Sequence, residues 1–226
     1  MRGNKRRLAS LLLFAASAAT ILYPTAADCW NSLRYSYLSG KYRTNCEQYS
    51  EDRTAALINC GITYNRLLNS STFLHPDAGL KEMYDQVLNP DGTGVIGTIE
   101  IPGLIGQIPV YHSVEETVLQ NGIGHIEGSS FPVFGESTHC ILAGHTGLKH
   151  SRLFTDLCRI RIGDTFRIRT LGIVSEYVVD DIRTVLPEDT GFLRLEKGRE
   201  YCSLITCTPY GVNSHRLIVR GIRMKQ

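Results

Sequence analysis

The sequence lacks a strong excess of charge of either sign. Its 226 residues include 24 Lys and Arg against 22 Asp and Glu. Four of the basic residues, Arg2, Lys5, Arg6 and Arg7, precede the first acidic residue, Asp28, and the rest of the chain holds 20 basic against 22 acidic residues. Domains that bind nucleic acid usually concentrate basic charge on one face. The near-neutral balance therefore argues against nucleic acid as a partner.

Closely spaced cysteine pairs are also missing, although the chain has seven cysteines. No C-x-x-C pair occurs, so a zinc site has little support and we expect no metal. The number is odd, so at least one thiol would remain after any disulfide pairing. Cys29, Cys46 and Cys60 could pair among themselves in an order that the sequence does not reveal, whereas Cys140 and Cys158 are expected in the core.

Long hydrophobic runs are absent except for one, residues 8–27, which contains no charge. Twenty helical residues span about 30 Å, the thickness of the hydrocarbon core of a bilayer. Because the basic residues precede the run, the positive-inside rule places residue 28 onward outside the cell. A cleaved signal peptide is the alternative, with residues 8–22 as its core and Thr25-Ala26-Ala27 as the cleavage site. Both interpretations place the rest of the chain beyond the membrane.

Proline is absent from residues 30–69, and an apolar stripe predicts a helix from Glu47 onward. Residues 70–94 are rich in turn formers and predict a loop with one helical turn near 81–88. After Gly94 the pattern changes to short β-type runs, which predict a closed barrel or a sandwich. The expected strands are 95–101, 107–111, 139–143, 165–170, 176–179, 201–206 and 216–220, with a short helix at 153–157. This pattern divides the chain into 1–27, 28–93 and 94–226.

The segment 201–220 reads as two β runs joined by a turn-rich loop. Adjacent strands lie about 4.8 Å apart, so a hairpin here would place Cys207 opposite Arg216. A guanidinium beside a thiol favours the thiolate, which is the nucleophilic form. Alternation along the second strand puts Leu217 and Val219 on one face and directs Arg216 to the other, toward a groove. The hairpin therefore predicts a nucleophilic cysteine.

A cysteine nucleophile also requires a proton donor for the leaving group. Among the seven histidines, His145 follows directly after a strand-like run that ends at Gly144. Strand ends commonly present catalytic side chains. His145 is therefore the first candidate for the acid, followed by His125 and His215.

Several motifs together resemble those of the sortases. Thr206-Cys207, with Leu204 before it and Arg216 nine residues after the cysteine, resembles the T-L-x-T-C…R signature of that family. The run TCTPYGVNSHRLIVRG, the stretches GHIEGSS, GHTGL and LFTDL, and Tyr23-Pro24 at the end of the apolar run look most like class C, the pilus-assembling sortases. The resemblance covers nearly the whole chain.

The resemblance implies an eight-stranded sortase-type β-barrel with an N-terminal helical region and a lid. It implies catalytic roles for His145, Cys207 and Arg216, a groove shaped by Thr206 and Thr208, an uncleaved membrane anchor, and no cofactor. The implied enzyme is a cysteine transpeptidase of the peptidase class on the outer face of the membrane of a Gram-positive cell.

In the implied reaction, the thiolate cleaves an LPXTG-like sorting signal between Thr and Gly and forms a thioacyl-enzyme. A lysine amine of another pilin then takes the acyl group, which polymerises a pilus. Two alternatives remain open: a sortase that attaches surface proteins to peptidoglycan cross-bridge amines, and a non-catalytic, membrane-tethered β-barrel that binds a surface partner.

The sequence departs from the family pattern at three places. Ser203 replaces the first Thr of the signature and keeps a hydroxyl. The segment expected to form the lid, about 70–92, lacks the family's Asp-Pro-aromatic motif and has His75-Pro76-Asp77 after Phe73, so Phe73 and His75 are the candidates for the residues that plug the groove. The second hydrophobic segment found at the C-terminus of many class C members is missing.

Overall fold

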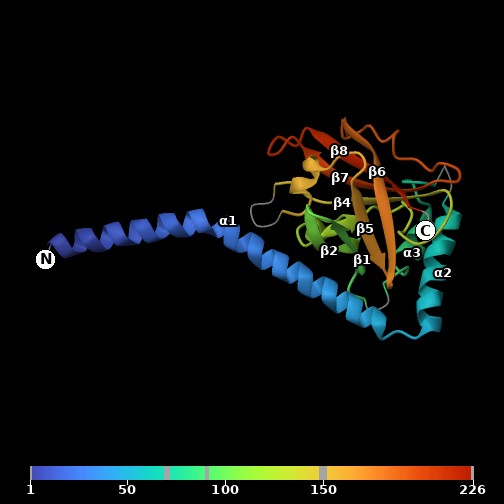
Figure 1. The fold of residues 1–226 in the computed structure, drawn as a ribbon, viewed down its shortest axis with the longest axis horizontal. Coiled ribbons are helices and arrows are strands. Elements are labelled where there is room, and N and C mark those ends of the chain that lie inside the picture. Colours follow the sequence, from blue (N-terminus) through green and yellow to red (C-terminus); the bar gives the residue numbers. More distant parts are fainter. Residues whose placement is uncertain (1, 69–71, 90–91, 148–151, 225–226) are drawn as a thin grey trace.

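Three helices precede the strands in the computed structural model, which describes residues 2–68, 72–89, 92–147 and 152–224 (Figure 1). They are α1 (Arg2–Glu47), α2 (Glu51–Leu67) and α3 (Ala78–Tyr84). Ser50 caps α2 by accepting a hydrogen bond from the Arg53 amide, and Asp77 caps α3 by accepting one from the Leu80 amide. Such caps satisfy amides that have no partner in the first turn of a helix. These caps explain why α2 and α3 begin where they do.

Eight strands in the described residues close into a barrel in the order β1-β2-β3-β4-β7-β8-β6-β5. The β2–β3 and β4–β7 pairs are parallel, and the other pairs are antiparallel. The strands are β1 (Val95–Ile101), β2 (Ile105–His112), β3 (Ile123–His125), β4 (Thr138–Ala143), β5 (Thr165–Thr170), β6 (Ile173–Val185), β7 (Glu200–Thr208) and β8 (His215–Arg223), with the short helices α4 (Glu116–Leu119) and η1 (Thr155–Arg159) in the connections.

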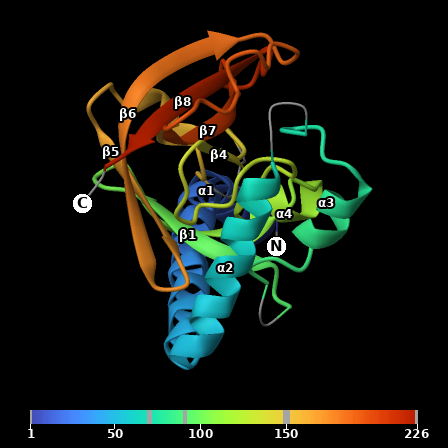
Figure 2. The same cartoon turned by 90° about the vertical axis from the view of Figure 1, so that its right-hand side faces the viewer.

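The hydrophobic core fills the barrel and extends under the helices. Inside the barrel, Leu142, Leu204 and Val219 have no exposed surface and belong to one continuous cluster. Tyr64 from α2 and Tyr84 from α3 are buried in the same cluster, and Figure 2 shows both helices along one side of the barrel. The helical region and the barrel therefore share a core.

The structure confirms the closed barrel and corrects several local expectations. The strand β3 was not predicted, because it has only three residues and no alternation to recognise. Cys158 is exposed on η1, whereas the sequence placed it in the core. The helix α1 runs without a break through residues 27 and 28, so the apolar run of residues 8–27 and the chain after it form one helix.

Candidate active site

The predicted nucleophile, Cys207, lies on the outer face of β4, β7 and β8. This is the side of the three strands that is turned away from the barrel interior. Alternation along each strand separates the two faces. Cys202 and Leu204 of β7 point into the barrel core, whereas Ile205 lies with Ile141 and Ile218 in a second hydrophobic cluster on the outer face. Cys207 lies two residues after Ile205 in the same strand, so its side chain belongs to the outer face.

Cys207 and Arg216 are direct partners in the antiparallel pair of β7 and β8. Side chains of directly opposite residues lie on the same face, with their β-carbons about 4.5–5.5 Å apart. The Arg216 Nη1 group donates hydrogen bonds to the carbonyl oxygens of Asn213 at 3.3 Å and His215 at 3.2 Å. The β7–β8 hairpin thus places Arg216 directly opposite Cys207 on the same face, as the sequence predicted, with one guanidinium nitrogen bonded to nearby backbone carbonyls.

His145 lies at the end of β4, beside the end of β7. Ala143 is the register partner of Ile205, and the Gly144 amide donates a 3.0 Å hydrogen bond to the Ile205 carbonyl. Continuing this parallel register by two residues places His145 next to Cys207. The side chain of His145 is 25% exposed, and its Nε2 atom lies 3.4 Å from Oε1 of Glu116 in α4. No local pattern in the sequence pointed to this carboxylate, because it comes from a distant element.

Thr206 fixes the chain on both sides of His145. It is 3% exposed, and its hydroxyl donates a 2.6 Å hydrogen bond to the Gly144 carbonyl. The hydroxyls of Thr146 and Thr206 are 2.8 Å apart. Thr206 therefore positions the β4 end from below the surface, whereas Thr208 is half-buried and pairs with His215 at the end of the hairpin.

A buried histidine lies farther along the same outer face. The His139 ring contacts the Ser203 hydroxyl at 2.8 Å and the Arg194 carbonyl at 2.8 Å. Burial lowers the pKa of His139 to about 4, so the ring is neutral at pH 7. The hydroxyl that Ser203 keeps in place of the expected Thr is therefore used as the partner of this ring.

The segment 72–77 crosses this outer face. The Phe73 ring is 6% exposed, stacks on the His139 ring with a centroid distance of 5.9 Å, and packs in the cluster of Ile141 and Ile218. His75, the other predicted plug residue, is exposed. Only Phe73 of the two covers the outer face. Within the predicted lid of 70–92, residues 70, 71, 90 and 91 lie outside the described residues.

Gly128 explains how the segment 72–77 is held. The Leu74 amide donates a 3.0 Å hydrogen bond to the Gly128 carbonyl. Gly128 has a φ of +79°, and a β-carbon there would lie 2.7 Å from Cδ of Pro76. Only glycine allows this close approach at a positive φ. The glycine of the GHIEGSS stretch thus allows the segment 72–77 to pack closely against it.

The other candidate histidines lie elsewhere. His125 has no exposed surface, and its Nδ1 and Nε2 atoms contact the Tyr84 hydroxyl and the Ser130 carbonyl, each at 3.0 Å. His215 is half-buried beside Ser214, its contact in the loop before β8. Neither shares the position of His145 at the β4 end. In the residues that the structure describes, no group of three or more His, Cys, Asp or Glu side chains could hold a metal ion.

A cavity of about 440 Å³ adjoins the outer face beyond His139. Its walls come from β6, β8 and the β6–β7 connection, and they include Arg183, Phe192 and Arg220. The guanidinium groups of Arg183 and Arg220 stand 4.1 Å and 4.9 Å from the centroid of the Phe192 ring. Arg220 also forms an ion pair with Asp180 at 2.6 Å. The outer face therefore continues into a polar recess with balanced charge.

Comparison with known proteins yields one family. The family described as "Sortase domain" matches residues 99–224. The crystal structure of sortase C1 from Streptococcus agalactiae is 42% identical with a TM-score of 0.81, covering 84% of this chain and 99% of that chain. Sortase C from Streptococcus pneumoniae, described with regard to catalysis and pilin substrate specificity, is 34% identical with a TM-score of 0.75, covering 84% of this chain and 97% of that one.

A curated relative is similar over a shorter length. Sortase A from Bacillus anthracis is 30% identical over 131 residues, which are 58% of this chain and 60% of the relative. The match thus spans less than two thirds of that protein.

Proposed function

Because this chain belongs to the sortase family, we propose that it is a membrane-anchored extracellular cysteine transpeptidase with Cys207 as its nucleophile. The observation that carries the proposal is the register pair of Cys207 and Arg216, with His145 beside them at the end of β4. A thiol, a guanidinium and an imidazole at one strand end supply a nucleophile, a donor to an oxyanion and a proton donor. The β7–β8 hairpin supplies the first two groups, and the end of β4, which is distant in the sequence, supplies the third.

The first half-reaction breaks a peptide bond. The Cys207 thiolate attacks the Thr carbonyl carbon of an LPXTG-like sorting signal, and Arg216 donates hydrogen bonds to the oxyanion that forms. The C–N bond to Gly then breaks, and His145 gives its proton to the departing amine. The enzyme is left as a thioester between Cys207 and Thr.

The second half-reaction forms a new amide bond. A lysine amine attacks the thioester carbonyl, the Cys207 thiolate leaves, and the proton of the amine returns to His145. One amide bond is exchanged for another, so the reaction requires no ATP. Arg216 again faces the tetrahedral oxyanion, because the attack occurs at the same carbon.

We infer that the acceptor lysine belongs to a pilin, so that the product is a polymerised pilus. The similarity to sortase C1 and to a sortase C studied for its pilin specificity supports this choice. Attachment of surface proteins to a peptidoglycan cross-bridge amine uses the same chemistry and is the second candidate. The two functions differ only in the amine that resolves the thioester.

The helix α1 supports the anchor. It is the one helix within the described ranges that is long and apolar enough to cross a membrane, and residues of its apolar part are exposed. A cleaved signal sequence would have the same composition. To distinguish an anchor from a cleaved signal sequence, the protein is isolated from the membranes of cells that express it, and the fraction of molecules that still contain residues 8–27 is measured.

Mass spectrometry of the thioacyl intermediate tests the enzyme assignment. Incubation with an LPXTG-type peptide should add the acyl fragment to Cys207, and Cys207→Ala should abolish both the adduct and peptide cleavage. Cys158→Ala, which removes another exposed thiol, is the matched control and should remain active. An unmodified Cys207, or cleavage by the Cys207→Ala variant, would favour the binding-module alternative.

Ligation to candidate acceptors tests the substrate class. With pilin subunits as donor and acceptor, the protein should produce ladders that survive boiling in detergent. Products that form only with cross-bridge peptides would favour attachment to the cell wall.

A further inference from the structure

The second half of α1 is fixed to the barrel through one of its faces. Tyr35 and Tyr42, which are seven residues apart and so lie on one side of the helix, are each 5% exposed. The Tyr42 hydroxyl donates a 2.9 Å hydrogen bond to the Ile96 carbonyl and accepts a 3.1 Å hydrogen bond from the Leu171 amide. These bonds reach two different barrel segments, so this half of α1 and the barrel form one body.

The opposite side of the same helix carries three large apolar residues that nothing in the described residues covers. Trp30, Leu33 and Tyr37 are 72%, 64% and 69% exposed. At about 100° per residue their directions fall within about 60° of one another. We call these three residues the aromatic face. Surface helices of soluble domains normally turn their polar side outward, so the aromatic face requires a partner.

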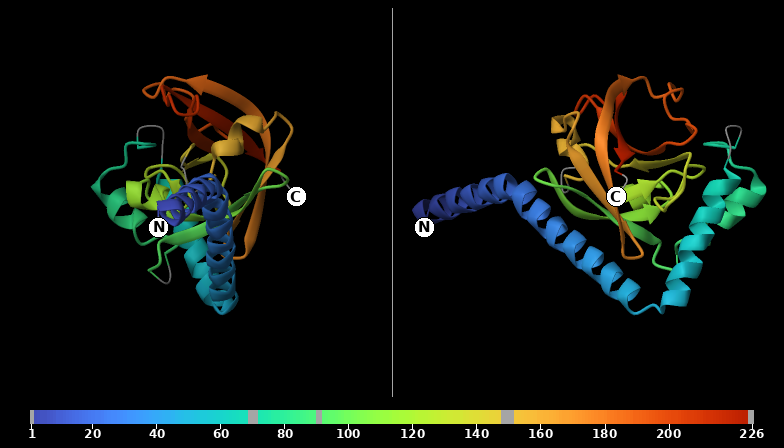
Figure 3. Two further views of the ribbon diagram at one scale, coloured as in Figure 1. Left: turned by 90° about the vertical axis from the view of Figure 1, so that its left-hand side faces the viewer. Right: turned by 45° about the vertical axis from the view of Figure 1, so that its right-hand side comes forward.

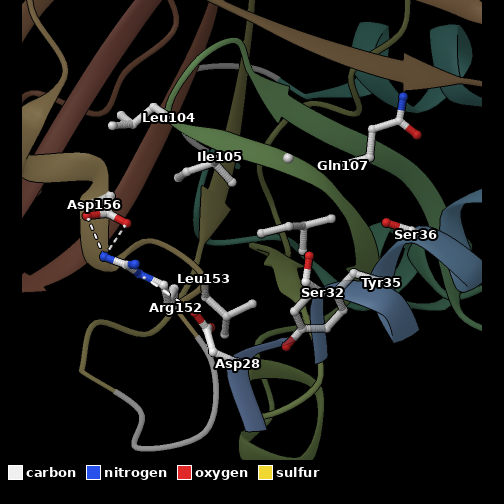
Figure 4. A pocket seen from close by; sticks show the side chains of 12 residues that line it. Asp28, Ser32, Tyr35, Ser36, Leu104, Ile105, Gln107, Arg152, Leu153 and Asp156 are labelled. Atoms are coloured by element: carbon white, nitrogen blue, oxygen red, sulfur yellow. Dashed lines mark hydrogen bonds and ion pairs between the residues drawn. The ribbon is translucent and has the colours of Figure 1, made fainter. Parts of the chain in front are cut away.

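Part of the side of α1 that faces the barrel is polar. Between α1 and β2 lies a cavity of about 210 Å³, to which α1 contributes Asp28, Ser32 and Ser36 (Figure 4). Arg152 lies at its edge, 4.0 Å from Asp28. Large apolar groups of this half of α1 therefore lie on both sides of the helix: Tyr35 and Tyr42 are buried against the barrel, whereas the three residues of the aromatic face are exposed.

The aromatic face is continuous with the membrane segment. Trp30 follows the apolar run of residues 8–27 after only two residues. Trp and Tyr concentrate at the boundary between lipid and water, where a ring with one polar atom suits both environments. Arg34 and Lys41 are also exposed and lie within about 40° of Trp30 around the helix. Their positive charges suit lipid phosphate groups.

We propose that the aromatic face lies in the headgroup layer of the membrane that residues 8–27 enter, an inference that rests on the anchoring proposed above. The helix α1 contains Pro24 and changes direction along its length (Figures 1 and 3). Proline allows such a bend because it removes one backbone hydrogen bond. Because the other face of α1 is bound to the barrel, this contact sets the height and orientation of Cys207 above the membrane.

Position 37 distinguishes this arrangement from an upright helix. A helix that left the membrane along its normal would carry Tyr37 about 15 Å beyond Ala27. The headgroup layer is only about 5–8 Å thick on each side of the bilayer. Tyr37 would then stand in water, whereas the proposed contact keeps it at nearly the depth of Trp30.

The single tryptophan of the chain makes the test direct. The full chain is reconstituted in vesicles of phosphatidylcholine and phosphatidylglycerol that contain phospholipids brominated on their acyl chains. Indole fluorescence is compared among the unmodified protein, the double variant Trp30→Tyr with Tyr37→Trp, and the control Trp30→Tyr with Leu67→Trp. Leu67 is a 53% exposed apolar residue at the end of α2, so its replacement is equally mild.

Quenching at position 37 close to that of Trp30, with little quenching at position 67, is the expected result. If the protein floats with the vesicles but tryptophan at position 37 is quenched no more than at position 67, the proposed contact of the aromatic face with the membrane is wrong, whereas the anchor still stands. Shielding of position 37 from aqueous iodide without quenching by the brominated lipid would also overturn it, because a protein surface would then cover the face. Protein that does not float with the vesicles would contradict the anchor as well.

Discussion

Single side chains on the outer face of β4, β7 and β8 decide what the proposed site can do. Arg216 differs from a simple positive charge because its guanidinium is a planar fork of several donors. Two of its hydrogen bonds, both from Nη1, go to carbonyls of its own loop. The remaining donors can face the substrate, which makes the shape of this group as important as its charge.

Arg216→Lys should therefore lose most activity although it keeps the charge. Loss of one donor to an oxyanion typically lowers the rate about a hundred- to thousandfold. The measurement is kcat/KM for cleavage of an LPXTG-type peptide. The control is Arg199→Lys, which makes the same replacement at an exposed position away from the site. A Lys variant with the activity of the unmodified protein would show that only the charge of Arg216 matters.

Glu116 is the side chain at the site that sequence reasoning missed. Its carboxylate lies 3.4 Å from His145 Nε2 and is 66% exposed. An exposed ion pair contributes about 0.2–1 kcal/mol and is screened by salt. Its expected effect is to orient the His145 ring at the end of β4.

Glu116→Gln should lower peptide cleavage by about two- to fivefold at low salt, and the difference should shrink at high salt. Glu115→Gln changes the neighbouring carboxylate and serves as the control. Equal losses in the two variants, or a loss that salt does not change, would argue against a role for the Glu116–His145 contact.

Among the elements, the segment 72–77 covers part of the outer face, and we expect it to limit the access of substrate. Phe73 occupies the hydrophobic cluster that Ile205 and Ile218 form near Cys207. Burial of a Phe side chain stabilises a structure by about 1.5–3 kcal/mol. A segment that must move before the substrate binds lowers the apparent affinity by the fraction of protein in the open form.

Phe73→Ala should therefore raise the rate at which Cys207 reacts with a peptide-based electrophile by about tenfold or more. His75→Ala should leave the rate unchanged, because His75 is exposed two residues away in the same segment. Labelling is followed by mass spectrometry at Cys207, and thermal unfolding confirms that both variants are folded. Equal rates for all three proteins would show that the segment is not a gate.

In the molecule as a whole, α2, α3 and the barrel share a core, so we expect them to unfold together. Two histidines in this body are neutral because of burial. Burial is the main reason that the pKa values of His112 and His139 fall to about 4, with the nearby His125 adding to the effect at His112 and Arg220 at His139. In an unfolded chain the pKa of histidine is about 6.5.

The free energy of unfolding should therefore fall as the pH decreases from about 6.5 to about 4, where the unfolded chain binds more protons than the folded one. Above about pH 6.5 the free energy of unfolding no longer changes with pH through these two groups. The loss on going down to about pH 4 is on the order of 3 kcal/mol for each histidine. Urea unfolding at a series of pH values measures the slope. His139→Asn should reduce this slope, and an unchanged slope would contradict the burial of a neutral ring at this position.

Local sequence patterns alone predicted short strands in a closed barrel or a sandwich, one long apolar run, and the Cys207–Arg216 pair. These follow from local information: alternation along strands, the length of an apolar run, and a hairpin whose two sides are close in the chain. Its position after a strand-like run made His145 the first candidate among the histidines, and the motif resemblance then raised it above the others. Each of these patterns lies within about twenty residues, so it does not depend on how distant parts of the chain pack.

The features that depend on distant segments emerge only in the folded chain. The parallel register of β4 and β7, continued by two residues, leads His145 to Cys207, and the helix α4 between β2 and β3 brings Glu116 to His145. The same folding buries Phe73 and leaves His75 in solvent. No local pattern encodes these contacts, because they depend on how strands far apart in the chain pack against one another and on which side chains fill the space between them.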